Sequence, residues 1–177
     1  MLKSNTITLA MLIILTGLVS LATIDFSNTA FAGTQIYSAQ LSGDKEVPPI
    51  QTNTSGTAEL RLPLSAIMSP QATVEYTVNV TDIENVTAAH IHKGKIGENG
   101  DIVVTLCKTG TCSSDGAMNG ALSVGETFNA TNLEGPMAGK QIEDLANNMS
   151  NGGTYINVHT LQHPNGEIRG QITGGTQ

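Results

Sequence analysis

The sequence predicts an all-β protein, an antiparallel Greek-key β-sandwich or flattened barrel of about eight short strands with one short helix. Three observations predict this fold class. Apolar and polar residues alternate in short segments, turn residues separate these segments at regular intervals, and only one segment has apolar residues at helical spacing. A mature chain of this length suffices for one domain with a hydrophobic core.

The clearest predicted strand covers residues 72–80. Its apolar side chains occupy every second position, and Thr, Glu and Asn occupy the positions between them. Such alternation is typical of a strand with one buried face and one face in water. Similar patterns predict the other strands, at residues 34–41, 57–62, 86–92, 101–107, 120–128, 154–160 and 167–173.

The single predicted helix covers residues 139–149. Its apolar residues recur at spacings of three and four, which places them on one helical face, and two glycines would end the helix. These residues are Ile142, Leu145, Ala146 and Met149, followed by Gly152 and Gly153. Residues 164–166, Pro-Asn-Gly, predict the turn before the last strand.

Residues 1–32 have the pattern of a secretory signal peptide. Lys3 is followed by an uncharged, mostly apolar run at residues 7–24, and small residues precede the expected cleavage near Ala32. The mature domain would then be residues 33–177, secreted or at the cell surface. The apolar run is also long enough for an uncleaved membrane anchor, which is the alternative. No later segment is apolar enough to span a membrane.

The two cysteines, Cys107 and Cys112, are separated by four residues. Outside the cytosol such a pair is expected to form a disulfide, with two free thiols as the alternative. The spacing is not Cys-x-x-Cys, so no redox motif is predicted.

The charge and the aromatic content exclude one class of partner. The net charge is -7, and the chain has three tyrosines, three phenylalanines and no tryptophan. Without a basic cluster or an aromatic platform on which bases could stack, the chain is not expected to bind nucleic acid.

The histidines suggest a metal site. The chain has four of them, in two pairs: His90 with His92, and His159 with His163. Residues two apart on a strand point to the same face, so the first pair would project side by side. Imidazole is a common ligand of copper and zinc. We therefore expect the four rings to converge on one ion, with Tyr155 and Asn157 supporting them; hydrogen-bonded structural histidines are the alternative.

Three motifs, in order, resemble the CHRD domain first described in chordin. They are Ser-Ala-Gln-Leu-Ser-Gly-Asp-Lys-Glu-Val-Pro-Pro at residues 38–49, Ala-His-Ile-His-Lys-Gly with Gly-Glu-Asn-Gly at 89–100, and Tyr-Ile-Asn-Val-His-Thr with Pro-Asn-Gly-Glu-Ile-Arg-Gly-Gln-Ile at 155–172. The resemblance implies an extracellular β-rich domain and leaves the chemistry open, because a fold does not define a function.

A weaker resemblance concerns the His-Ile-His segment at residues 90–92. It is similar to the His-x-His of copper–zinc superoxide dismutases, which hold copper with four histidines and carry an arginine that attracts the anion. The resemblance implies a copper site, with zinc as the alternative ion, and superoxide as the small anionic substrate. The sequence around His159 and His163 does not match that family, and no histidines remain for a zinc site, so a copper-only enzyme would be expected.

Positive charge near this site would help an anionic substrate to enter. Arg169 is the candidate catalytic residue, and Lys93 and Lys95 follow the first histidine pair directly. The alternatives are a salt bridge of Arg169 with Glu46 or Glu167, and two lysines that are simply solvated. Three functions stay open: a dismutase-like enzyme, a non-catalytic extracellular CHRD binding module, and a copper carrier or storage protein or zinc-stabilised scaffold.

Overall fold

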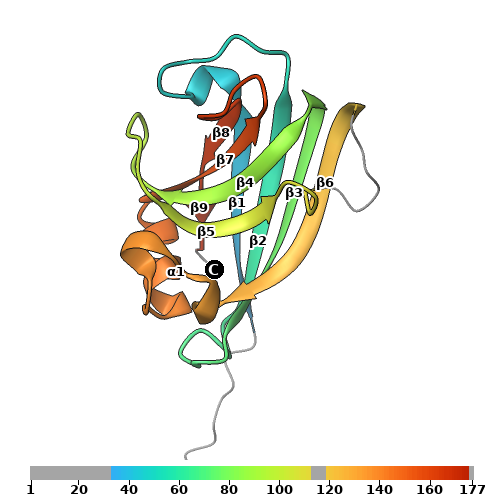
Figure 1. Cartoon of the computed structure of the whole chain (residues 1–177). Coiled ribbons are helices and arrows are strands. Elements are labelled where there is room, and N and C mark those ends of the chain that lie inside the picture. Colours follow the sequence, from blue (N-terminus) through green and yellow to red (C-terminus); the bar gives the residue numbers. More distant parts are fainter. Residues whose placement is uncertain (1–32, 113–118, 176–177) are drawn as a thin grey trace, which may run out of the picture.

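The computed structural model describes residues 33–112 and 119–175, so the predicted signal peptide at 1–32 lies outside the described residues. One antiparallel sheet curls until it nearly closes into a barrel (Figure 1), which confirms the predicted fold class. Its strands are β1 (Thr34–Ser42), β2 (Ser55–Pro63), β3 (Thr73–Glu84), β4 (Val86–Lys93), β5 (Ile102–Lys108), β6 (Asn119–Asn129), β7 (Thr154–Thr160), β8 (Ile168–Gln171) and β9 (Thr173–Gly174).

The order of the strands brings distant parts of the sequence together. It runs β5-β4-β7-β8-β1-β2-β3-β6, and β9 pairs with β1. In Figure 1, β4 and β5 cross in front of β1, β2 and β3, as in two layers of a flattened barrel. Strand β7 therefore lies between β4 and β8, and this places the residues around His159 beside those around His90.

Strand β3 shows how the core forms. Val74, Val78 and Val80 are buried, and the alternate positions are exposed, as the sequence predicts. Strand β7 differs because all seven of its residues are buried. Ile156 and Val158 belong to the hydrophobic core, so the alternate positions of β7 face outward, where other segments must cover them.

One α-helix, α1 (Ile142–Ser150), is present in the described part of the chain. Its buried face consists of the four residues that the sequence predicts, Ile142, Leu145, Ala146 and Met149. Three short 3-10 turns accompany it: η1 (Gly43–Lys45), η2 (Ala130–Asn132) and η3 (Gly135–Met137). The predicted last strand, 167–173, is interrupted at Ile172, and its end pairs with β1 as β9.

Candidate metal centre

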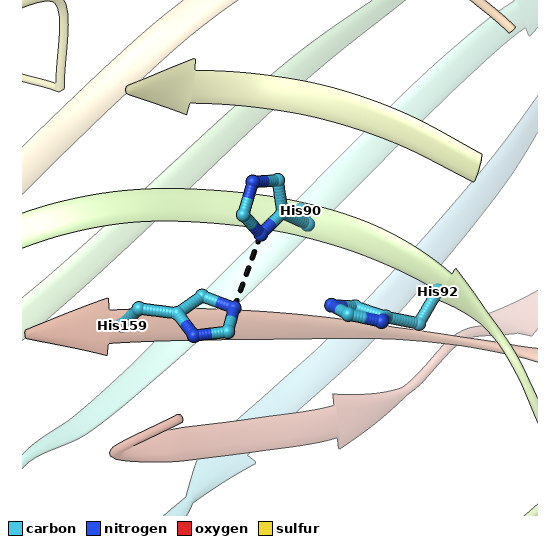
Figure 2. Close-up of side chains that lie close together, drawn as sticks. All are labelled: His90, His92 and His159. Atoms are coloured by element: carbon cyan, nitrogen blue, oxygen red, sulfur yellow. Dashed lines mark hydrogen bonds between the residues drawn. The ribbon is translucent and has the colours of Figure 1, made fainter. Parts of the chain in front are cut away.

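Three of the four histidines meet on the outer face of β4 and β7. Ala89 and Ile91 of β4 point into the core, so His90 and His92 point outward. His159 projects from β7, which pairs with β4. Figure 2 shows the three rings gathered over these two strands. One ring nitrogen from each histidine lies within 4.8 Å of those of the other two.

Hydrogen bonds define which nitrogens are free. His92 Nδ1 donates to the Gly100 carbonyl at 2.9 Å, and His159 Nδ1 donates to the Pro164 carbonyl at 3.0 Å, since a carbonyl can only accept. The Nε2 atoms of both rings therefore carry lone pairs. His159 Nε2 lies 3.0 Å from His90 Nδ1, and His92 Nε2 is buried with no hydrogen-bond partner. A buried unpaired acceptor is costly, and this nitrogen is free to bind a ligand.

Burial keeps the three rings neutral. It lowers the pKa of His90 to about 4, and the proximity of His159 and His92 adds to the effect. Burial also lowers the pKa of His92 and of His159, against the opposing effect of their hydrogen bonds to carbonyls. Neutral imidazole is the form that binds a metal ion, so the cluster is in its ligating form at neutral pH.

A stack of three side chains extends from the cluster. The rings of His92 and Tyr155 are stacked, with centroids 4.9 Å apart and planes at 6°. The guanidinium of Arg169 lies 4.0 Å from the centroid of the Tyr155 ring. Because β7 separates β4 from β8, Tyr155 stands between the histidine and the arginine. This stack holds the orientation of the His92 ring.

The connection between β4 and β5 covers this stack. The Gly100 amide donates to the Tyr155 hydroxyl, and the Gly100 carbonyl accepts from His92. A Cβ at Gly100 would lie 1.6 Å from the Lys93 carbonyl oxygen, so only glycine fits. Gly100 was not predicted to be a site residue, although it belongs to the Gly-Glu-Asn-Gly motif at residues 97–100.

The segment after η1 covers the rest of the outer face. The buried carboxyl of Glu46 accepts from the Asn157 amide, and the Val47 carbonyl accepts from Asn99. Burial raises the pKa of Glu46 to about 7, although the charge of Arg169 lowers it. Asn157 is the β7 residue that pairs with His90 in register. The Glu46 segment therefore supports the strand that carries His159.

The structure does not bring His163 into the cluster. Its amide binds the hydroxyl of Thr160, and its side chain lines a separate polar cavity of about 630 Å³ together with Glu167. The buried Glu167 carboxylate accepts from three hydroxyls, those of Thr52, Thr54 and Thr160. The predicted set of four histidines is thus a set of three in this geometry.

Arg169, the candidate catalytic residue, is buried and does not face the histidine cluster directly, because Tyr155 lies between them. The arginine is 3% exposed, and its terminal nitrogens donate to the Glu98 carbonyl and to Asn99 Oδ1. The alternative salt bridge is not formed either, because the ion pair found in the described ranges is Arg61 with Glu59. Lys93 and Lys95 are exposed, as the alternative reading of two solvated lysines expects.

The remaining predictions concern the environment of the domain. Cys107 and Cys112 form the expected disulfide at the end of β5. Within residues 33–112 and 119–175, no helix has both the length and the hydrophobicity that crossing a bilayer requires.

Comparison with known proteins supports the motif analysis. The family model of the CHRD domain matches residues 37–172, which include the three clustered histidines, the stack and both covering segments. No curated protein and no solved structure matches the chain. CHRD domains are typically extracellular, and the disulfide agrees with that location. This match extends over most of the sequence, and the chain therefore belongs to the CHRD domain family.

Proposed function

We propose that this protein binds one copper ion through His90, His92 and His159 and disproportionates superoxide outside the cell. The observation that carries the proposal is the buried, unpartnered Nε2 of His92, which faces a cluster of neutral imidazoles. Two of the three rings have their other nitrogen fixed by a backbone carbonyl. Metal-binding histidines are typically held in this way.

The donor set fits a copper ion. Nitrogen ligands at about 2 Å from one ion lie at most about 4 Å apart, so the observed limit of 4.8 Å requires only small rotations of the rings. Imidazole suits copper and zinc alike. Three histidines with an open position are also a zinc ligand set, so zinc is the alternative ion.

Copper, when bound, supplies the one-electron couple that this reaction requires: one superoxide is oxidised to oxygen, and a second is reduced and takes two protons to give hydrogen peroxide. The protein contributes the shape and the charge of the site. His90 is only partly buried, whereas His92 and His159 are nearly inaccessible, so a small anion would approach beside His90. The Nδ1–H groups of His92 and His159 keep donating to their carbonyl partners and hold both rings in place.

The positive charges near the cluster fall into two groups, two exposed lysines and one buried arginine. Lys93 and Lys95 are exposed at the end of the strand that carries His90 and His92, where they can attract an anion to an otherwise acidic protein. Arg169 is buried behind Tyr155, and its charge lowers the pKa of His92. We therefore assign Arg169 the role of a positioning residue for Tyr155 and His92.

A non-catalytic binding module is the second candidate, and the position of Arg169 favours it. In copper–zinc superoxide dismutases an arginine attracts the substrate. Here both terminal nitrogens of Arg169 donate to Glu98 and Asn99 in the β4–β5 connection. An arginine that only holds this connection in place is what a non-catalytic domain requires.

The first experiment measures metal content and affinity. Protein purified without a histidine tag should contain about one copper per chain or take it up when titrated. His92→Gln and His159→Gln should each weaken copper binding by at least about tenfold. His163→Gln is the matched control, because His163 lies outside the cluster, and its affinity should stay unchanged.

The second experiment separates the functions. Copper-loaded protein should consume superoxide, and His92→Gln should not. Tight copper binding without turnover would identify a carrier or storage protein. Zinc at one ion per chain, with no turnover, would identify a stabilised scaffold. Absence of any metal binding at the three histidines would leave the non-catalytic module.

A further inference from the structure

A cavity of about 280 Å³ lies beside β8, on the side of Arg169 away from the histidines along the strand order. Its walls come from η1, the β4–β5 connection, β1 and the β8–β9 strand. Two cationic side chains line it, Lys45 and Arg169, and no carboxylate does. In a chain with a net charge of -7, such a lining concentrates positive potential in one small concave site.

The cationic groups have unused hydrogen-bond donors. Lys45 Nζ donates to the Gln40 carbonyl, and an ammonium has two further protons. Arg169 is 3% exposed and uses its two terminal nitrogens for Glu98 and Asn99. In the described part of the chain, the Nε–H of Arg169 has no hydrogen-bond partner. A nearly buried cation with an unpaired donor in a cavity wall is suited to an anionic ligand.

The rest of the wall combines one large apolar side chain, Ile96, with the polar residues Gln40, Gln171 and Thr173. Ile96 is 83% exposed, and the lining also includes Gly97. A cavity of this size holds a ligand smaller than a typical drug molecule. From the cations, the absence of carboxylates and the apolar side chain, we propose that this cavity binds a small organic carboxylate with a short apolar tail. The proposal is independent of the metal centre and of superoxide chemistry.

The cavity also contacts the metal centre indirectly. Arg169 packs on Tyr155, and Tyr155 stacks on His92. Two side chains, Arg169 and Tyr155, would therefore separate a carboxylate in the cavity from His92. Binding itself needs no metal, so it can be measured on metal-free protein.

The test uses butyrate as the probe and butyramide as its uncharged analogue. Proton–nitrogen NMR of the metal-free protein should show saturable shifts of the Arg169 Nε–H and of the Ile96 and Gly97 amides with butyrate. Butyramide should bind at least about tenfold more weakly, because it lacks the charge that both cations meet. Acetate should also bind more weakly, because it lacks the tail that contacts Ile96.

Lys45→Gln should weaken butyrate binding by about fivefold, which is a typical effect of an exposed charge. Lys140→Gln is the control with the same charge change, because Lys140 is exposed and does not line the cavity. The proposal would be overturned by any of three results: butyramide binds as tightly as butyrate, the two lysine variants lose the same butyrate affinity, or no signal shifts saturably at about 50 mM butyrate. The Arg169 Nε–H signal of the unaltered protein gives the answer even if a variant folds poorly.

Discussion

The two buried glutamates, Glu46 and Glu167, should affect the free energy of unfolding with opposite pH dependence. Glu46 is 6% exposed and accepts one side-chain hydrogen bond, from Asn157, whereas Glu167 is 7% exposed and accepts three from hydroxyls. Burial raises the pKa of Glu46 to about 7. At Glu167 burial also acts to raise the pKa, but the hydroxyl donors and the nearby His163 together leave it lowered.

Proton linkage determines whether the Glu46 carboxyl stabilises or destabilises the fold at a given pH. A carboxyl whose pKa is raised in the folded state stabilises the fold below its unfolded pKa, and this contribution is lost as pH rises through about 7. A shift from 4.5 to about 7 corresponds to at most about 3 kcal/mol. Because solvent screens part of this cost, we expect about 1–2 kcal/mol.

Glu46→Gln keeps an acceptor for Asn157 and removes the charge. It should therefore raise the free energy of unfolding at pH 8 by about 1–2 kcal/mol and have little effect at pH 5. Glu167→Gln should lower it by about 2–3 kcal/mol at pH 8, because three hydroxyls lose a charged acceptor. Urea unfolding of metal-free protein at the two pH values measures both. A destabilised Glu46→Gln at pH 8, or variants that change in the same direction, would refute the reasoning.

Three further predictions concern the metal centre and the disulfide. Gly100→Ala should lower copper affinity by about tenfold and reduce thermal stability, because the added Cβ displaces the carbonyl that orients His92; isothermal titration and thermal melts measure both effects. Tyr155→Leu should weaken copper binding by a similar factor, since it removes the ring stacked on His92; unchanged affinity would contradict the role of the stack. Replacing Cys107 and Cys112 by serine should cost about 2 kcal/mol in chemical denaturation, as expected for so short a loop, and should leave copper affinity unaltered.

The strands and one part of the site could be predicted from local patterns. Alternation in β3 and helical spacing in α1 predict their buried faces correctly. The pairing of His90 with His92 follows from the two-residue period of a strand. His159 joins them because β7 pairs with β4, a long-range contact that no local pattern contains. The CHRD motifs predicted that both segments belong to one domain, although not that they are neighbours.

The failures occur where a turn or a covering segment decides the direction of a side chain. His163 lies beyond the end of β7, and the hydrogen bond from its amide to Thr160 accompanies a turn that leaves its ring outside the cluster. Arg169 was predicted to attract an anionic substrate, but the β4–β5 connection folds over it, and its guanidinium is buried and donates to that connection. Strand periodicity gives the face on which a residue lies, and it does not give what covers that face.

The distribution of buried polar groups gives a physical reason to locate function on this face. The buried polar residues of the described chain come from β4, β7, β8 with its preceding turn, and the segment after η1: Glu46, Thr54, His92, Thr154, Asn157, His159, Thr160, Glu167 and Arg169. Burying such groups stabilises a fold less than apolar packing would, and the rest of this barrel is packed with apolar side chains. In the described part of the chain, the buried side-chain atoms without a hydrogen-bond partner are His92 Nε2 and Thr154 Oγ1. His92 belongs to the three-histidine cluster, so this cluster is where a bound ion would satisfy a buried polar atom that the fold itself leaves unpaired.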